Sequence, residues 1–309
     1  MLKPSLIAVA VVTALASTAS AAAPAKTTGR ATLKGVDYYY EVRGQGEPVL
    51  LLHGGLGSID MLEPQLPAFA GRQLIAVDLQ GHGRSTMGNR PIRCEAIADD
   101  MAALLKRLGR TKVDVFGYSF GGCVGLRLAV QHPEVVRRLA LVSAPFAADG
   151  WYPEMREQQK QVSAALAPMM KETPMYKSYV AVAPKPEDFP RLLDAMGEYM
   201  RQPYDWSADV AKLAKSKTPV MIVFGDADMV RPEHQVKFYQ LLGGGLKDAG
   251  WNRESMSRNR WAVLPDLTHY DIFASPRLGE TVLPFLDGQS GAKSWAEQVK
   301  GQTTTARGK

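Results

Sequence analysis

The chain has 309 residues, of which 46% are hydrophobic and 22% are charged, and its formal net charge is +6. This composition is that of an ordinary globular protein. Lys and Arg are scattered among nearby acidic residues, so no nucleic-acid-binding patch is predicted, and the expected partner is a small molecule. The oligomeric state is left open.

The first 23 residues predict a secretory signal peptide. Lys3 precedes an apolar stretch from Leu6 to Ala16, and small residues follow as far as Ala23, near which cleavage is expected. A membrane anchor is the weaker interpretation, because a bilayer span needs about 20 apolar residues and this stretch is shorter. We therefore expect an exported protein, periplasmic or secreted, with no membrane span after the signal is removed.

Continuous apolar runs predict the strands of a mainly parallel sheet. An antiparallel hairpin that turns at Lys34-Gly35 comes first, and the later runs follow at intervals too long for hairpins. A helix is expected from Glu95 to Leu108, where apolar residues recur at every third or fourth position. The first four runs are Val49 to Leu52, Leu74 to Val77, Val113 to Phe116 and Leu139 to Val142.

The alternation of strands and helices stops after Val142. The next segment is helix-prone and contains seven prolines but no strong strand, so it predicts a helical cap. Two more runs, Val220 to Phe224 and Trp261 to Leu264, and a final helix from Arg277 to Leu286 complete the pattern. The expected fold class is α/β, a doubly wound, mostly parallel sheet of about eight strands with a cap.

The domain boundaries follow from the same pattern. The core is assigned to residues 29–148 and 218–287, and the cap to residues 149–217. The polar tail, residues 288–309, contains too few apolar side chains to form a core and is expected to be disordered.

The stretch from Gly117 to Gly121, Gly-Tyr-Ser-Phe-Gly, is a G-x-S-x-G pattern between a buried strand and a helix. Such a turn is so sharp that the serine backbone is strained and its hydroxyl projects outward, which small residues on both sides permit. The following helix N-terminus favours negative charge. The pattern predicts Ser119 as a nucleophile.

A serine hydroxyl is a weak nucleophile without a base, so a histidine is expected at a strand end further along the chain. His269 follows the run Trp261 to Leu264 and meets this requirement. His132 is interpreted as a surface residue, His234 as a residue that opens a helix, and His82 as part of a loop.

An acid that orients the base is expected after the run Val220 to Phe224, where Asp226 and Asp228 both occur. One of them is expected to orient His269, and the other to shape the turn or pair with Arg231. The chain order Ser, Asp, His is that of the α/β-hydrolases.

Several motifs together resemble the α/β-hydrolase superfamily, in the capped branch that includes esterases, lactonases and carbon-carbon bond hydrolases. The resemblance spans Val36 to Leu286. The motifs are His53-Gly54-Gly55, the stretch from Asp78 to Ser85, the serine turn, the G-x-x-D segment that ends at Asp228, and Thr268-His269.

The resemblance implies that Asp228, not Asp226, is the acid. It also implies an oxyanion hole formed by the backbone amides of Gly55 and Phe120, with Leu56 as the alternative to Gly55. His53 is expected to form structural hydrogen bonds. One departure is that the connection over residues 243–260 is longer than is usual in the family.

The expected activity is hydrolysis of a carboxylic ester, lactone or thioester of a small, largely apolar substrate through an acyl-enzyme. Carbon-carbon bond hydrolysis, cofactor-free perhydrolysis and ligand binding without turnover are the alternatives. No cofactor or metal is expected, because Gly81-His82-Gly83 lacks the Lys of a phosphate-binding loop and no ligand spacing is present. Cys94 and Cys123 are compatible with a disulfide, but the sequence gives no distance between them.

The cap segment is rich in soft and aromatic side chains suited to a pliable apolar pocket. Most of them are expected to form the cap core, and a minority to line the cleft. They are Met169, Met170, Met175, Tyr176, Tyr179, Met196, Tyr199, Met200, Tyr204 and Trp206.

Overall fold

The computed structural model describes residues 26–289 and 292–299. The predicted signal peptide, residues 1–23, lies outside them, as does part of the predicted tail. Within the tail, residues 295–299 form a short helix. No helix in the described ranges is long and apolar enough to cross a membrane.

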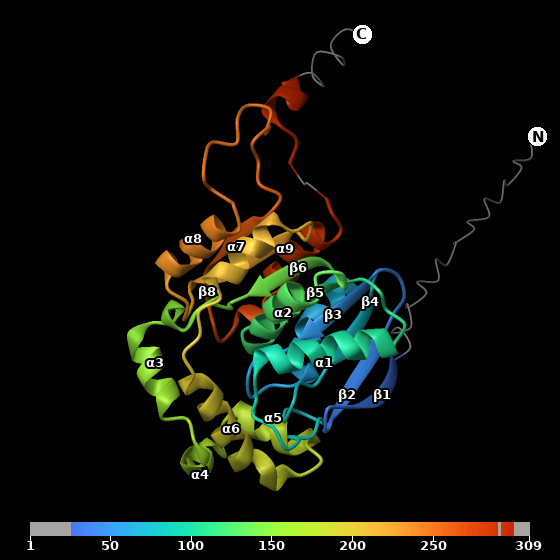
Figure 1. Ribbon diagram of the computed structural model, residues 1–309, viewed down its shortest axis with the longest axis vertical. Helices are drawn as coiled ribbons and strands as arrows, with labels where there is room; N and C mark the ends of the chain where they lie inside the picture. Colours follow the sequence, from blue (N-terminus) through green and yellow to red (C-terminus); the bar gives the residue numbers. More distant parts are fainter. Residues whose placement is uncertain (1–25, 290–291, 300–309) are drawn as a thin grey trace, which may run out of the picture.

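Eight strands form one sheet in the order β1-β2-β4-β3-β5-β6-β7-β8 (Figure 1). Strand β2 is antiparallel to both β1 and β4, and all other neighbours are parallel. The predicted fold class is therefore confirmed. The strands are β1 (Lys26–Leu33), β2 (Val36–Arg43), β3 (Pro48–Leu52), β4 (Gln73–Val77), β5 (Val113–Tyr118), β6 (Val136–Val142), β7 (Val220–Ala227) and β8 (Arg260–Thr268).

Helices cover both faces of the sheet. One face carries α1 (Cys94–Arg107), α2 (Phe120–Gln131), α7 (Ser207–Lys215) and α8 (Pro232–Leu241), and the other carries the 3₁₀ segment Ile59–Phe69 and α9 (Pro276–Leu286). In β3, Leu50 and Leu52 pack on the first face, while Val49 and Leu51 pack on the second. Each such buried side chain contributes about 2 kcal/mol. The strands are apolar throughout because both faces are covered.

The cap consists of α3 (Pro153–Lys160), α4 (Ala167–Met170), α5 (Pro174–Val182) and α6 (Phe189–Arg201). Helices α3, α4 and α5 all contact α6. Helix α7, at the end of the predicted cap segment, instead contacts α2 and α8, because its apolar side chains Val210 and Leu213 are buried there. The helices that extend away from the sheet are thus α3 to α6 (Figure 1).

Strands β7 and β8 extend beyond the apolar runs that predicted them. After a register shift, Ala227 pairs with Thr268, so both strands continue through polar residues to the edge of the sheet. The apolar pattern ends earlier because the last residues of β7 and several of β8 are exposed. Asp228 and His269 consequently follow two paired, adjacent strand ends.

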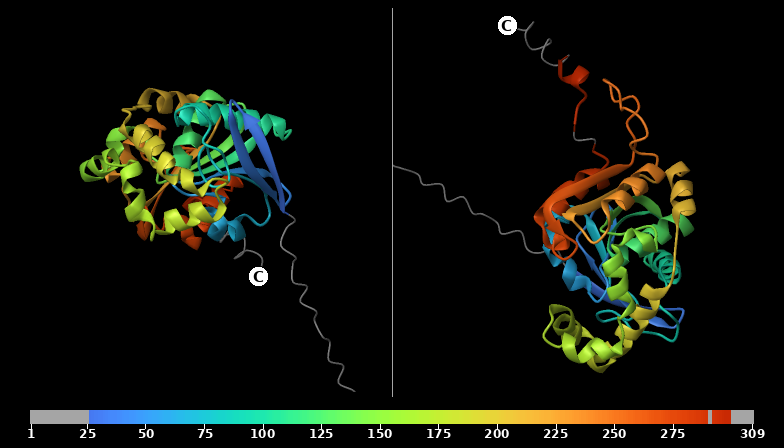
Figure 2. Two further views of the ribbon diagram at one scale, coloured as in Figure 1. Left: turned by 90° about the horizontal axis from the view of Figure 1, so that it is seen from below. Right: turned by 90° about the vertical axis from the view of Figure 1, so that its left-hand side faces the viewer.

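The long connection predicted between the acid and the base projects from the body. Residues 243–260 lie beside residues 292–299, and we call these two segments the arm. The arm and the cap lie at opposite ends of the molecule (Figures 1 and 2).

Candidate active site

Ser119 occupies the sharp turn between β5 and α2. Its backbone has φ 52° and ψ −116°, a conformation that non-glycine residues rarely adopt. A Cβ on Gly117 would lie 2.4 Å from the carbonyl oxygen of Gly121, and a Cβ on Gly121 would lie 2.4 Å from that of Leu52. The two glycines are therefore required by the close packing of strand, turn and helix.

Ser119, His269 and Asp228 form a continuous chain of polar contacts. Oγ of Ser119 lies 3.0 Å from Nε2 of His269, and Nδ1 of His269 lies 3.1 Å from Oδ1 of Asp228. When the carboxylate accepts the Nδ1 hydrogen, Nε2 has a free lone pair and can accept the serine proton. The structure thus brings together the three residues predicted as nucleophile, base and acid.

The two candidate acids have different surroundings. Asp228 is buried, and its Oδ1 also accepts a hydrogen bond of 3.1 Å from the amide of Val230. Asp226 is exposed at the end of β7, where its Oδ1 accepts a hydrogen bond of 3.2 Å from the amide of Leu267 in β8. Asp226 therefore stabilises the pairing of the two strand ends, while Asp228 faces the imidazole.

Two polar side chains that hold this arrangement were not predicted. The hydroxyl of Ser143, a buried residue directly after β6, donates a hydrogen bond to Oδ2 of Asp228. The hydroxyl of Tyr118 donates to the carbonyl oxygen of His269 and so fixes the loop that carries the imidazole. The sequence did offer one indication of Ser143, because it directly follows an apolar run. Ser119, Asp228 and His269 also follow strands in this way.

The other four histidines are held in contacts away from Ser119. Both ring nitrogens of His53 bond to the backbone, as the sequence predicted for a structural residue. Burial lowers the pKa of His53 and of His234 to about 4 and, with a further contribution from His53, that of His82 to about 3. His132 lies at the surface beside Asp99, at 2.9 Å.

The two residues predicted to supply oxyanion amides are neighbours. A Cβ on Gly55 would lie 3.7 Å from Cβ of Phe120. The amide of Gly121 donates a hydrogen bond of 3.0 Å to the carbonyl oxygen of His53, which holds the loop after β3 against the start of α2. Leu56, the alternative to Gly55, has a left-handed backbone with φ 57°. Both loops therefore meet at the turn that carries Ser119.

Helix α6 of the cap reaches these loops. Cε of Met196 lies 3.1 Å from the position that a Cβ on Gly55 would occupy. The ring of Tyr199 packs edge-on against that of Phe120, with 5.1 Å between centroids. Met196 and Tyr199 are thus the cap residues that lie against the predicted oxyanion loops.

The histidine side of the site is covered by Trp151, whose ring lies edge-on to that of His269 at 5.6 Å. Trp151 precedes α3 and forms a β-bridge with Val230, close to Asp228. Tyr179, by contrast, packs against Phe189 within the cap, with 5.2 Å between ring centroids. Within the cap, Tyr179 is thus a core residue, while Met196 and Tyr199 lie against the loops that carry Gly55 and Phe120.

The loop from Asp78 to Ser85 lies beneath the site and has a structural role. Asp78 accepts hydrogen bonds from the amides of Ile59, at 2.7 Å, and Arg84, at 2.8 Å. The guanidinium of Arg84 pairs with Asp60 at 2.9 Å. These contacts hold the loop as a packed turn.

The described residues contain no cluster of three His, Cys, Asp or Glu side chains suited to a metal ion. Cys94 and Cys123 are both buried free thiols, so the structure contains no disulfide between them. The Cys94 thiol donates to the hydroxyl of Tyr199 at 3.2 Å, and burial raises its pKa.

The α/β-hydrolase fold model matches residues 47–175. Pimeloyl-[acyl-carrier protein] methyl ester esterase of Neisseria meningitidis serogroup C is 31% identical over 256 residues, which are 74% of this chain and 90% of that protein. "Putative carbamate hydrolase RutD" of Azorhizobium caulinodans is 38% identical over 133 residues, 43% of this chain but only half of that protein. The enol-lactonase of Burkholderia xenovorans LB400 shares the fold, with a TM-score of 0.63 at 18% identity over 84% of this chain and 100% of that one. The chain therefore belongs to the α/β-hydrolase superfamily.

Proposed function

We propose that the protein is a serine hydrolase that cleaves carboxylic esters, lactones or thioesters of small, largely apolar substrates. The observation that carries this proposal is the contact chain from Ser119 through His269 to the buried Asp228. The strained backbone of Ser119 also supports the proposal, because this unusual conformation directs the hydroxyl toward His269.

In the proposed reaction, Oγ of Ser119 attacks the carbonyl carbon and its proton passes to Nε2 of His269. Asp228 stabilises the imidazolium, which then gives the proton to the leaving oxygen or sulfur as its bond to carbon breaks. Water attacks the resulting acyl-enzyme, with His269 taking the water proton and returning a proton to Ser119. The amides of Gly55 and Phe120 would each donate a hydrogen bond to the oxyanion that forms on the substrate. Each such bond would lower the activation free energy by about 3 kcal/mol.

The apolar preference is supported by the side chains that face the site. Met196 and Tyr199 lie against the oxyanion loops, and Trp151 lies against His269. Such a lining favours an apolar acyl group, because a charged group would lose its hydration there. The names of two similar proteins, a methyl ester esterase and an enol-lactonase, are consistent with ester and lactone substrates.

A fluorophosphonate probe tests whether the serine is activated. We expect stoichiometric labelling of the wild-type protein, no labelling of Ser119→Ala, and loss of nearly all ester hydrolysis in that variant, with an unchanged circular dichroism spectrum. An unlabelled wild type would instead support ligand binding without turnover.

A substrate panel then separates the reaction classes that share this machinery. Nitrophenyl esters, lactones, thioesters, a cleavable diketone, and acetate with hydrogen peroxide are assayed with wild type and Ser119→Ala. The proposal requires that an ester, lactone or thioester gives the highest kcat/KM. A higher value for the diketone or for peracid formation would replace it with one of the alternatives.

We also propose that the protein is exported, on the support of the signal-peptide pattern in residues 1–23. Fractionation of cells that express the full chain, with N-terminal sequencing of the mature protein, tests this. Export with a new N-terminus near Ala23 is expected, and uncleaved protein in the cytoplasm would contradict the proposal.

A further inference from the structure

Exposed apolar side chains are concentrated on the arm. Of the eleven large hydrophobic residues that are exposed in the described part of the chain, five belong to the arm. Trp251 is 77% exposed, Leu246 67% and Trp295 64%. Large apolar groups left in water in one place indicate a surface that binds a partner.

The two segments of the arm contact each other at their aromatic residues. The rings of Trp251 and Trp295 lie 5.5 Å apart, and the guanidinium of Arg253 donates to the carbonyl oxygen of Ala292. Both tryptophans line a hollow of about 550 Å³ together with Lys293. The aromatic side chains therefore form one surface feature, although they are 44 residues apart in the sequence.

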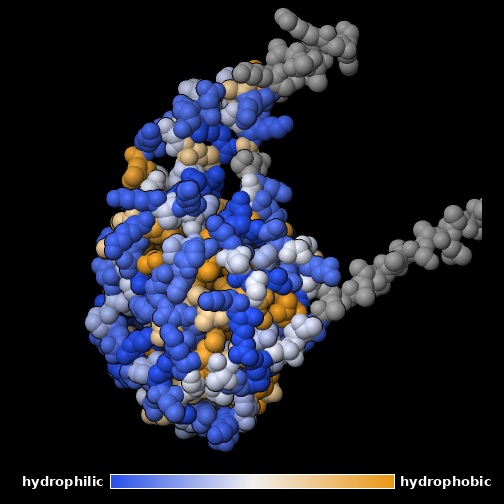
Figure 3. Space-filling view, turned by 45° about the vertical axis from the view of Figure 1, so that its right-hand side comes forward, coloured by the Kyte–Doolittle hydropathy of each residue, from blue (hydrophilic) through white to orange (hydrophobic). Residues whose placement is uncertain are grey.

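The same end of the chain carries most of its net charge. The arm and the ten residues that follow it, 300–309, contain eight Lys and Arg but three Asp and Glu, a net charge of +5 against +6 for the whole chain. The described arm itself has five Lys and Arg against three Asp and Glu, and the remaining three cationic residues, Lys300, Arg307 and Lys309, lie outside the described residues. Figure 3 shows the arm as a mostly hydrophilic projection, in agreement with these charged side chains.

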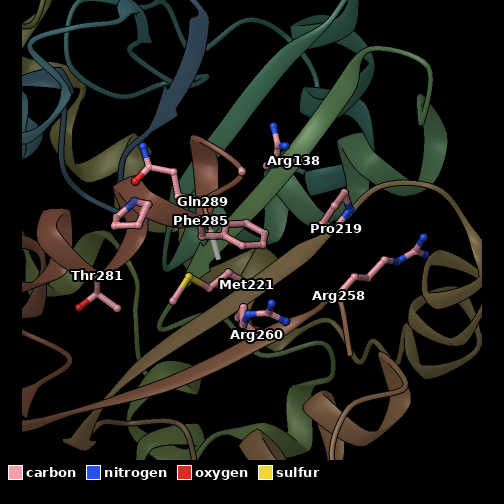
Figure 4. Close-up of a pocket in the computed structure, with 10 residues that line it drawn as sticks. Arg138, Pro219, Met221, Arg258, Arg260, Thr281, Phe285 and Gln289 are labelled. Carbon is pink, nitrogen blue, oxygen red and sulfur yellow. The ribbon is translucent and has the colours of Figure 1, made fainter. Parts of the chain in front are cut away.

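At the base of the arm, two of its own cationic residues, Arg258 and Arg260, lie near Arg138 of the body. Arg138, Arg258 and Arg260 line a pocket of about 320 Å³, around the apolar side chains of Phe285 and Met221 (Figure 4). Within the described residues these three guanidinium groups donate hydrogen bonds to backbone carbonyl oxygens. The positive potential of the arm therefore continues onto the body.

We propose that the arm docks the protein onto the surface of an anionic lipid bilayer. Tryptophan prefers the membrane interface, where its ring meets the acyl chains and its N–H meets the headgroups. Lys and Arg beside it are attracted to anionic headgroups, and their long side chains can reach them. Exposed indoles beside Lys and Arg, at an end of the chain with a positive net charge, match such a membrane surface better than they match a neutral protein groove.

The position of the arm is compatible with catalysis on the docked protein. The arm leads into the first residue of β8, Arg260, at the amino edge of the sheet. Ser119 and His269 follow strand ends at the carboxyl edge, where the cap lies. Docking through the arm therefore leaves the site facing away from the bilayer, and arm variants should keep their activity in solution.

Sedimentation with lipid vesicles tests the proposal. The full-length mature protein is mixed with phosphatidylcholine vesicles, with or without phosphatidylglycerol, at about 0.1 M and about 1 M salt, between which the screening length falls from about 10 Å to about 3 Å. We expect binding to the anionic vesicles at the lower salt concentration, and weak binding in the other conditions.

Two double variants separate the apolar and the ionic contributions. Trp251→Ala with Trp295→Ala, and Lys247→Glu with Lys293→Glu, should each lower the partition coefficient about tenfold or more. Met169→Ala is the matched control, because Met169 is 76% exposed but lies on the cap. All variants should retain the wild-type circular dichroism spectrum, which shows that they fold, and wild-type hydrolysis of a soluble nitrophenyl ester. Ser119→Ala should bind vesicles like the wild type.

Three results would overturn the proposal. The first is no binding to anionic vesicles at the lower salt concentration, and the second is binding that survives the tryptophan double variant. The third is concentration-dependent self-association that the tryptophan variant abolishes, since the occupant would then be a second copy of this chain. None of these results depends on the proposed hydrolytic activity.

Discussion

Ser143 donates a hydrogen bond to Oδ2 of Asp228, the carboxylate oxygen opposite the one that faces His269. Ser143 directly follows β6 and is buried, with a left-handed backbone of φ 52°. The carboxylate is therefore held from both sides, by a hydroxyl on one oxygen and an imidazole on the other. This contact restricts rotation of the acid that orients the base.

Ser143→Ala should lower kcat while leaving KM nearly unchanged. A hydrogen bond to a charged group contributes about 1.5 to 3 kcal/mol, which corresponds to a loss of about tenfold to a hundredfold in kcat if it is used to position Asp228. Steady-state kinetics with a nitrophenyl ester measure this split. Ser178→Ala, which removes an exposed hydroxyl from α5, is the control and should behave like the wild type. A stability loss without a change in kcat would mean that Ser143 is only structural.

The two aspartates near the end of β7 should differ strongly in their effect on turnover. Asp228→Asn should lower kcat by about 10⁴-fold, because the amide favours the wrong imidazole tautomer. Asp226→Asn is the matched control; it touches the backbone of Leu267 rather than His269, so kcat should change by less than about threefold. Steady-state kinetics on both variants provide the comparison. The opposite ranking would reassign the acid.

The sequence was sufficient for the sheet, for Ser119 and for His269 because each depends on a local pattern, whereas Asp228 was chosen over Asp226 only through the family resemblance. Continuous apolar runs identify strands covered on both faces, and Gly117 and Gly121 mark a turn with no room for a Cβ. The residues that were missed act through contacts between distant segments. Ser143 meets Asp228 only after β6 and β7 pair, and Tyr118 reaches a loop 151 positions away.

The cap shows a second limit of sequence analysis. Helical spacing indicates which side chains of a cap helix are buried, but not whether they pack against the cap or against the core. Tyr179 looked as suitable for the cleft as Met196, yet it packs against Phe189, and Met175 is 39% exposed. Only the docking of α6 on the oxyanion loops distinguishes Met196 and Tyr199 from the others.

The buried His234 should make the fold sensitive to mild acid. Its pKa of about 4, lowered mainly by burial, is below the ordinary value of about 6.5, so the unfolded chain binds more protons between these two values. The neutral His234 side chain therefore makes its full contribution to the free energy of unfolding above about pH 6.5. This contribution is lost as the pH falls toward about 4.

Substitution of His234 by Gln should remove this part of the acid sensitivity. A glutamine amide oxygen can accept the hydrogen bond that Nε2 of His234 accepts from the amide of Phe146, at 3.2 Å, without gaining a proton. The free energy of unfolding is measured with urea at about pH 7.5 and at about pH 5. It should decrease between these two pH values in both proteins, and the decrease should be about 2 kcal/mol smaller in His234→Gln than in the wild type. His132→Gln, at the surface, is the control. Equal losses in the wild type and His234→Gln would show that His234 does not contribute.

Met196 should limit the length of the acyl chain. Its Cε lies beside Gly55, so truncation would open space next to the proposed oxyanion hole. Met196→Ala should raise kcat/KM for a longer nitrophenyl ester relative to the acetate by about tenfold, the scale of one or two methylene groups in an apolar pocket, and Met196→Phe should shift the ratio the other way. Met175→Ala, on the cap surface, is the control and should leave the ratio unchanged.

Because Met196 is fully buried, the alanine variant should also lose about 2 to 5 kcal/mol of stability. Activities are therefore compared at a temperature at which urea titration shows that the variant is folded. Chain-length profiles that are identical in the wild type and both Met196 variants would place the acyl pocket elsewhere in the site.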